Sequence, residues 1–578
     1  MSDTGLKLQL LFLARSYFDT GISMLASNHW DAQYALSLDL WQRYASACFI
    51  VGDIKTMKSC LHETLNHAKS FDDSLMARSL AVQLLASSGK FDDAMDNGLM
   101  MLQNLGEEFP RGEISLFSIQ DMLNTALPTL KNIASNPDLM KNLFPMSNCN
   151  KLDAMQVMAI LRKVNLRSHS KLIPFLGWRM VSMTLEYGLC DESIIGLVVT
   201  GLSLVSILSI MWCVIFYDVK VSPLRYIFVC ILQFRFTEHV HLGYRIGKIG
   251  EALIEENSMK HLLWSQITLE LGTLKMAIEP PQSVISVYPE RYNSAMISGD
   301  VDSAMGVGVI FCIANFYLGL TDLNTASKHF VSIMKEALKY KKNGRYFQAN
   351  ALLNPCLYLA GASFPGNFDA DGIELRCFND LDCIAQKTND SQLLFECFIG
   401  RITCLFWMAK YKEVADLCKQ IQHVQKSLLD VIRFFYEGIA SLSLARETSG
   451  EESQKSREKG IACVSHMTEL EKLSAWNFSH RARLLQAELH FTMGFIALAE
   501  STYILAIQTA CEHKFKHDAS LAHELYGKFC VKNRKLEKGQ DHLTLALDGY
   551  REWGATRKVN DLQQYINQVQ IMVSNEEL

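Results

Sequence analysis

The amino-acid sequence predicts an all-α solenoid, a right-handed superhelix of antiparallel helix pairs. Apolar residues recur at three- and four-residue steps through most of the chain, and one turn pattern returns between the predicted helices. The chain has 578 residues, more than the roughly 250 to 300 at which a single hydrophobic core stops growing. A repeat array is free of that limit because each unit packs only on its neighbours.

The first helix pair illustrates the repeating unit. Residues 31–49 place Leu36, Leu40 and Tyr44 on one predicted helical face, and Gly52 ends that helix. A second helix, predicted over 54–70, completes the hairpin. The next hairpin repeats the arrangement, with its own glycine turn 37 residues further on.

The predicted turns share a small first residue, a variable residue, an apolar residue and then polar residues. An apolar side chain at the third position would fill the gap between paired helices, and a small residue would permit their close approach. Two of the apolar positions are 41 residues apart, which is one helix pair in a repeat class of roughly 34 to 47 residues. The turns begin at Gly52, Gly89, Gly319, Ala409, Gly494 and Arg534.

Two stretches interrupt the repeats and define the predicted organisation. Residues 446–460 lack large apolar side chains and predict a solvated polar loop. Residues 191–240 include a long uncharged run. The expected order is N-terminal repeats over 1–190, the apolar segment over 191–240, middle repeats over 241–445, the polar loop, and C-terminal repeats over 461–578.

The uncharged run extends over 24 residues, from Ile194 to Tyr217, and satisfies the length of a membrane span. Three interpretations stay open: a buried solenoid helix, a transmembrane helix with aromatic residues near one end, or an insertion foreign to the repeats over about 208–236. A single span would place the two halves of one solenoid on opposite sides of a membrane.

The net charge and the cysteine content limit the kinds of function that this protein can have. The formal net charge is -5, from 56 basic and 61 acidic residues, and gives no electrostatic reason to expect nucleic-acid binding. The 16 cysteines are scattered without a C-x-x-C, and the nearest pair, Cys377 and Cys383, lacks zinc-site spacing. No secretory signal is evident. We therefore expect reduced, buried thiols and an intracellular, cytoplasmic protein, or alternatively a membrane-associated one with a single span.

The sequence provides no catalytic motif, so we expect no catalytic, cofactor-binding or metal-binding residues and no cofactor. Gly89-Lys90, Gly247-Lys248 and Gly527-Lys528 all lack the earlier glycine and the following Ser or Thr of a phosphate-binding loop. His480 lies in a segment similar to the phosphoacceptor box of sensor histidine kinases. No glycine-rich ATP-binding domain follows it, and we interpret the segment as the first helix of a hairpin whose second helix begins near Ile496.

Three segments resemble the tetratricopeptide-like helical-repeat region of large multidomain signalling proteins: His29 to Asp53, Ser87 to Pro110, and Gly549 to Leu562, which contains Trp553-Gly554-Ala555. In that family a serine/threonine kinase-like domain and a predicted signal-transduction ATPase precede the repeats, and sensor or histidine kinase domains often follow. The resemblance implies a tetratricopeptide-like superhelix that senses or scaffolds beside an ATP-driven switch. None of the family's catalytic motifs is found in this sequence, so the resemblance transfers no catalytic residue.

The same family resemblance bears on the uncharged run. The family pattern leads within a few residues from Leu204-Val205-Ser206 to a segment like His241 to Gly247, whereas about 30 residues intervene in this chain. This departure favours an insertion.

The sequence therefore predicts a non-enzymatic scaffold or sensory solenoid associated with an ATPase- or kinase-based signalling system. Its expected partner is a protein or peptide on the concave face. The alternatives are a membrane-anchored solenoid that recruits partners to a bilayer through Ile194 to Tyr217, and a fragment of a larger signalling ATPase or histidine kinase.

Overall fold

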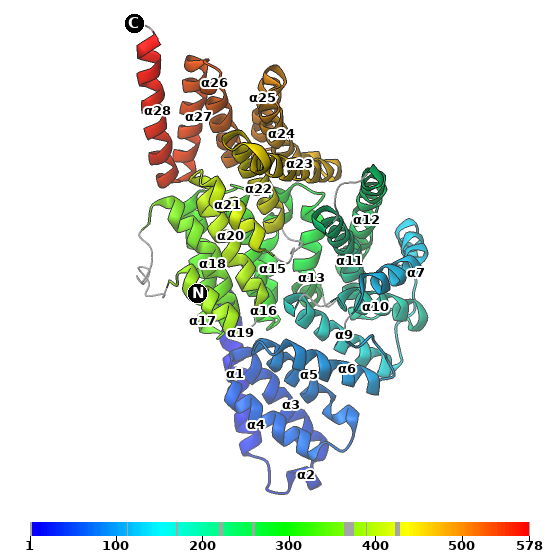
Figure 1. Ribbon diagram of the computed structural model, residues 1–578. Helices are drawn as coiled ribbons and strands as arrows, with labels where there is room; N and C mark the ends of the chain where they lie inside the picture. The colour runs from blue at the N-terminus through cyan, green and yellow to red at the C-terminus, as the bar shows by residue number, and fades with distance from the viewer. Residues whose placement is uncertain are drawn as a thin grey trace.

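The computed structural model of the chain is built from helices, in agreement with the predicted all-α solenoid (Figure 1). In the described residues the only strand-like pairing is one isolated parallel bridge between Pro145 and Leu189. The structure describes residues 3–112, 114–168, 171–218, 223–256, 260–362, 375–388, 390–421 and 428–576; within these ranges, the side chains of 3–12, 116, 165–168, 205–218, 223–237, 260–262, 265 and 572–576 are not described.

The N-terminal repeats occupy the lower part and right side of Figure 1. The N-cap residue Asp53 accepts a hydrogen bond from the Thr56 amide and so begins the second helix of the first hairpin. The helices of this part are α1 (Asp3–Ser23), α2 (His29–Ala32), α3 (Tyr34–Val51), α4 (Ile54–His67), α5 (Phe71–Ser87), α6 (Phe91–Asn104), α7 (Leu116–Ser135), α8 (Asp138–Lys141), α9 (Cys149–Ser168) and α10 (Ile173–Tyr187).

The uncharged run lies on α11 (Asp191–Asp218), which packs against α12 (Pro223–Glu256). Its first part is buried, with Ile194, Val198 and Leu204 at most 2% exposed inside the N-terminal core. The side chains of residues 205–237, which include the predicted insertion over 208–236, are not described. In the part of the chain whose side chains are described, no helix is long and apolar enough to cross a membrane.

Two glycines allow α11 and α12 to approach closely. A Cβ atom built on Gly201 would lie 2.5 Å from the carbonyl oxygen of Gly243, and a Cβ on Gly243 would collide with the Gly201 carbonyl in the same way. Only glycine fits such a crossing, because the obstacle is backbone and cannot move aside like a flexible side chain.

The middle repeats fill the centre of the molecule (Figure 1). Asp300, Asp322 and Asp390 serve as N-caps here, each accepting the amide hydrogen three residues further on. The helices are α13 (Lys260–Met276), α14 (Pro281–Ser286), α15 (Tyr288–Ile297), α16 (Val301–Tyr317), α17 (Leu323–Lys339), α18 (Asn343–Ala360), α19 (Phe378–Thr388), α20 (Ser391–Trp407), α21 (Tyr411–Gln420) and α22 (Leu428–Glu447).

The predicted polar loop over 446–460 is wrong, because most of it is helical. Helix α23 begins at Gly450, and the Lys455 ammonium lies 2.5 Å from the Glu451 carboxylate one turn away. Such i,i+4 pairs support the exposed first turns of α23, whereas its second half buries Val464, Met467 and Leu470. The C-terminal helices are α23 (Gly450–Leu473), α24 (Ala475–Thr492), α25 (Ile496–Glu512), α26 (Lys516–Lys532), α27 (Leu536–Trp553) and α28 (Thr556–Glu576).

The turns predicted from the sequence are confirmed between the paired helices. Gly52, Gly89, Gly319 and Gly494 all have positive φ, which glycine adopts without steric cost. Ala409 and Arg534 adopt positive φ of 54° and 59° in equivalent turns. The helix predicted over 54–70 is shorter in the structure, where α4 ends at His67. Helix α5 begins at Phe71, because the Ser70 side chain caps it by accepting from the Asp73 amide.

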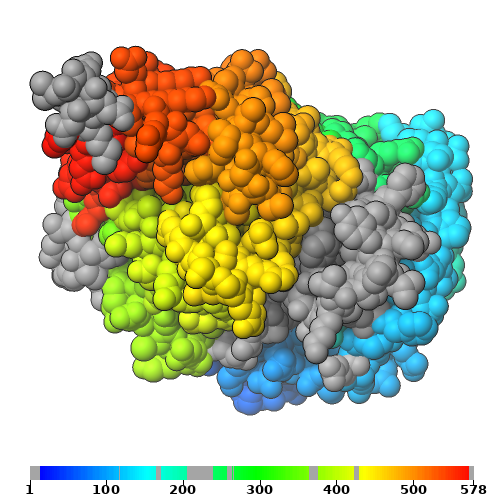
Figure 2. Space-filling view, turned by 45° about the horizontal axis from the view of Figure 1, so that its top comes forward, coloured from blue at the N-terminus to red at the C-terminus, as the bar shows by residue number. Residues whose placement is uncertain are grey.

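The C-terminal repeats pack against the middle repeats as well as against their neighbours in sequence. The Arg481 guanidinium of α24 donates to the Tyr317 carbonyl at the end of α16, and Trp553 of α27 lies with its ring centroid 5.1 Å from that of Trp407 on α20. Figure 2 shows the orange-to-red C-terminal repeats resting on the green-to-yellow middle repeats. One continuous hydrophobic core therefore joins both parts.

Candidate partner-binding surface

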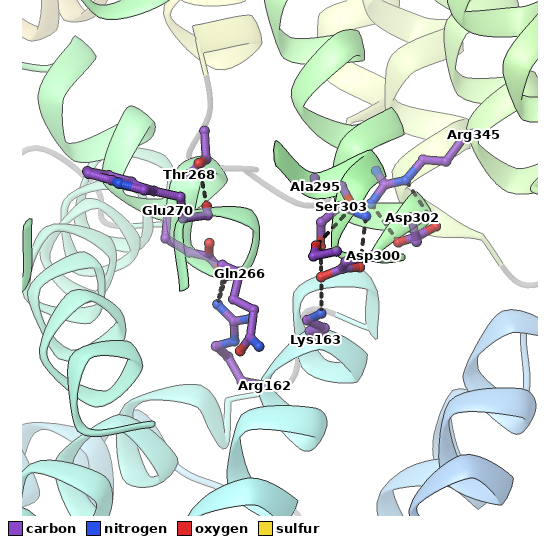
Figure 3. Close-up of polar contacts among 12 residues, drawn as sticks. Arg162, Lys163, Gln266, Thr268, Glu270, Ala295, Asp300, Asp302, Ser303 and Arg345 are labelled. Carbon is purple, nitrogen blue, oxygen red and sulfur yellow. Dashed lines mark hydrogen bonds and ion pairs between the residues drawn. The ribbon is translucent and has the colours of Figure 1, made fainter. Parts of the chain in front are cut away.

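Several buried charged side chains of the described residues form ion pairs within the chain. Figure 3 shows two networks of polar contacts between α9 and the middle repeats. The Arg162 guanidinium, 1% exposed, donates to the Glu270 carboxylate at 2.5 Å and to the Gln266 carbonyl at 2.9 Å. This buried ion pair joins α9 to α13.

The second network of Figure 3 joins α9 to α16 and α18. The Lys163 ammonium lies 2.7 Å from the carboxylate of Asp300, which also accepts from the Ser303 hydroxyl at 2.8 Å. Burial alone would raise the pKa of Asp300, but Lys163 and Ser303 hold it below its usual value. A second ion pair joins Arg345 to Asp302 with a nitrogen-to-oxygen distance of 3.0 Å. These groups fix neighbouring repeats and have no arrangement of nucleophile and base.

Glu396 lies on α20 and extends these polar contacts. It is fully buried, and one oxygen, Oε1, accepts hydrogen bonds from the Gln348 and Gln392 amides at 2.5 and 2.6 Å. Its second oxygen has no hydrogen-bond partner. Burial raises the pKa of Glu396 to about 8, so the carboxyl group is largely protonated near neutral pH.

His480 lies in α24 inside a buried charged cluster. Its Nε2 atom is 2.9 Å from Asp518 Oδ2, the Arg481 guanidinium reaches the same oxygen at 2.8 Å, and its ring stacks on Phe515. Burial lowers the pKa of His480. At 2% exposure the imidazole is inaccessible to a phosphoryl donor, and α25 begins at Ile496 as the hairpin interpretation predicts.

The inner helices of the C-terminal repeats are covered by the chain itself. Helices α24 and α26 bury residues on all sides, because each packs between neighbouring helices of the repeats, and α24 also contacts the ends of α13 and α16. The Asn477 amide, for example, donates to the Met276 and Glu279 carbonyls at 2.8 and 2.9 Å. A partner that binds the C-terminal repeats must therefore use their outer face.

That outer face is apolar along α25. Leu498 is 49% exposed, Leu505 42% and Ile504 38%, and the exposed residue Ser501 lies between them on the same side of the helix. Phe495, 56% exposed, continues the patch into the preceding turn. We call Phe495, Leu498, Ser501, Ile504 and Leu505 the α25 face.

The second helices of other hairpins expose fewer large apolar residues: α4, α6, α17 and α27 expose one each (Leu65, Met100, Leu338 and Leu545), and α21 exposes none. On α21 the exposed residues are Lys412, Glu413, Asp416, Lys419 and Gln420. The repeat fold thus forms without apolar residues at these positions, and packing does not explain those on α25. An exposed apolar patch of this kind is a candidate interaction surface.

Charged groups border the α25 face on the side of α27. The Glu500 carboxylate of α25 binds the Lys535 and Lys538 ammonium groups at 2.5 and 2.9 Å. The hydrogen bonds from these two lysines lower the pKa of Glu500 to about 2. Exposed carboxylates at Asp541, Asp548 and Glu552 follow along α27.

The described residues contain no group of three or more His, Cys, Asp or Glu side chains that could hold a metal ion. Fourteen described cysteines are free thiols, and Cys377 and Cys383 belong to this set without a bond between them.

Sequence reasoning missed the α25 face. Most residues of α25 are apolar, and a strongly apolar helix normally indicates burial. The signal available in the sequence was the difference from α21, whose charged residues follow a helical period, whereas α25 has only Glu500 and Glu512 as charged residues.

No protein-family model matches this chain, and no curated protein matches it either. Among solved structures, the chain is similar to a circular tandem repeat protein described as having a novel repeat topology and enhanced subunit contact surfaces. The sequences are 10% identical, the match covers 92% of this chain and 95% of the other, and the TM-score is 0.13. The arrangement of the helices in this chain defines it as an all-α helical-repeat protein.

Proposed function

We propose that this protein is a non-enzymatic scaffold that binds a partner protein through the α25 face. The apolar outer face of α25 is the observation that carries the proposal, because α21 shows that the fold does not need it. A helical-repeat fold is compatible with this role, since it presents extended surfaces on a rigid framework.

The signalling system to which this protein belongs is proposed from its sequence resemblance, and its location from its cysteines. The resemblance of three segments to signalling proteins supports a place beside an ATPase- or kinase-based switch, either as a separate subunit or as part of a longer chain. The free thiols support an intracellular, cytoplasmic location. The concave face of the N-terminal repeats is proposed as a second binding surface.

The test compares three full-length baits in affinity capture from cells: the wild type, Leu498→Glu/Leu505→Glu, and the control Lys412→Glu/Lys419→Glu on α21. Each substitution replaces an exposed side chain and should change stability by less than about 0.5 kcal/mol. Equal melting temperatures will establish that all three baits are folded.

We expect the α25 variant to lose a protein that the wild type and the control both capture. Purified samples of that protein should then bind the wild type directly and bind the α25 variant at least about tenfold more weakly, since exposed apolar anchors dominate interfaces. If the three baits capture the same proteins in the same amounts, the α25 face is not a binding surface and the proposal fails.

A further inference from the structure

The exposed residues of α25 follow the spacing that a second helix recognises. Leu498, Ser501, Ile504, Leu505 and Gln508 are exposed at steps of three and four residues, so they form one stripe over three turns. A stripe of this length is about 15 Å long. An amphipathic helix docks on such a surface with anchors at i, i+3, i+4 and i+7.

The charge of the two outer helices indicates what should flank those anchors. Helix α25 carries Glu500 and Glu512 and has no lysine or arginine, while α27 carries four carboxylates against Lys538 and Arg551. Six acidic and two basic residues give the two helices a formal charge of -4, and Lys535, the N-cap residue of α27, reduces it to -3. The two basic residues are already engaged, Lys538 with Glu500 and Arg551 with Asp548.

Helices α21 and α17 lack this acidic character. Helix α21 has two lysines and two carboxylates, and α17 has three lysines and one glutamate. Helix α6 is also acidic, with Asp92, Asp93 and Asp96 and no lysine or arginine, so acidic charge is found on some outer helices and not on all. On α25 and α27 the acidic charge accompanies the apolar stripe. It also opposes docking on a bilayer, because anionic lipids attract basic surfaces.

We propose that the occupant of the α25 face is an amphipathic helix of a partner protein, with leucine-type anchors flanked by lysine or arginine. This inference rests on the proposed function and specifies the chemistry of its partner. The anchors contact Leu498, Ile504 and Leu505, and the basic flank faces Asp541 and Glu552 on α27. Charges at such a rim mainly set the association rate and the choice of partner.

The test uses three synthetic peptides of about 18 residues, long enough to form a helix on binding. One has leucines at i, i+3, i+4 and i+7 with lysine flanks, the second has the same leucines with glutamate flanks, and the third has lysine flanks with shuffled leucines. Fluorescence anisotropy measures their binding to the full-length protein at low and high salt.

We expect the lysine-flanked peptide to bind at least about tenfold more tightly than the glutamate-flanked one at low salt, and this preference should shrink at high salt. The shuffled peptide should bind weakly. Asp541→Lys/Glu552→Lys should reverse the preference, and the matched control Glu413→Lys/Asp416→Lys on α21 should leave it unchanged. Leu498→Glu/Leu505→Glu should abolish binding of all three peptides.

Different results of this experiment would contradict this inference and the proposed function. Equal binding of the lysine- and glutamate-flanked peptides, lost in the α25 variant, would overturn the basic partner and leave the α25 face as a binding surface. Equal binding of the shuffled peptide would overturn the helical partner. Self-association of the full-length chain that the α25 variant abolishes would replace the proposed partner by a second copy. Peptide binding that is insensitive to the α25 variant would contradict both proposals.

Discussion

Glu396 shows how far burial changes the chemistry of one residue. Its pKa rises from an ordinary value near 4.5 to about 8, because a carboxylate loses its hydration inside the protein and two neutral amides replace it only partly. Between these two pH values the folded protein holds a proton that the unfolded chain has released. The contribution of Glu396 to stability must therefore fall as the pH rises from about 4.5 to 8.

The substitution Glu396→Gln tests this pH dependence. Glutamine keeps an oxygen that can accept from Gln348 and Gln392 but does not ionise, so the loss of stability with rising pH should become smaller by up to about 1.4 kcal/mol per pH unit. Urea unfolding at pH 6 and pH 8.5 measures the effect, with exposed Glu413→Gln as control. Identical pH dependence in the wild type and Glu396→Gln would show that Glu396 ionises normally in the folded protein.

At the residue scale the sequence predicted burial better than it predicted partners. The segment around His480 was interpreted as the first helix of a hairpin, and the buried imidazole agrees. Its contact with Asp518, 38 residues away, could not be predicted, because the relative rotation of two helices depends on packing across the whole repeat. The same holds for Arg162 and Glu270, which are 108 residues apart.

At the scale of the helix, glycines decide how closely α11 and α12 can approach. Gly201→Ala would place a methyl group against the Gly243 carbonyl and force the helices apart. We expect it to cost on the order of 1 to 3 kcal/mol of unfolding free energy, as overpacked cores do.

Gly21→Ala is the matched control for this prediction. A Cβ on Gly21 would lie 3.7 Å from the Leu40 side chain, at ordinary contact distance. Alanine there should stabilise α1 by about 0.5 to 1 kcal/mol, because it has the higher helix propensity. Urea unfolding of both variants measures the difference. A Gly201→Ala variant as stable as the wild type would mean that the two helices do not cross at these glycines.

The helices themselves were predictable wherever apolar periodicity and a positive-φ turn occurred together. Gly52 and Gly494 are examples of such turns. Lys341 and Lys514 also adopt positive φ, but lysine gives no sequence signal for this conformation. The helix over 450–473 was missed because its first turns are held by pairs such as Glu451 and Lys455, and not by an apolar face.

At the scale of the whole molecule, the chain departs from a linear array of repeats. The sequence predicted the order of the hairpins. It could not show that α24, α26 and α27 pack against α16 and α20. The contact between Arg481 and the Tyr317 carbonyl spans 164 residues. Contacts of this kind have no local pattern, since the two residues interact only after the repeats have stacked.

Trp553→Ala tests this long-range packing. The Trp553 ring is 5% exposed and lies 5.1 Å from Trp407 and 6.2 Å from Phe316 between ring centroids. Its removal should cost about 3 to 5 kcal/mol. Amide hydrogen exchange should then accelerate in α16 as well as in α27. Acceleration confined to α27 and α28 would indicate that each repeat depends only on its neighbours in sequence.

The most direct test of the central claim is photo-cross-linking in intact cells. A photoreactive phenylalanine derivative replaces Ser501, at the centre of the α25 face, and in a second protein it replaces Lys412 on α21. We predict that the probe at Ser501 forms a discrete adduct, that the probe at Lys412 forms none, and that Leu498→Glu/Leu505→Glu removes the adduct. No adduct from Ser501, or the same adducts from both positions, would contradict the assignment of α25 as the partner-binding surface.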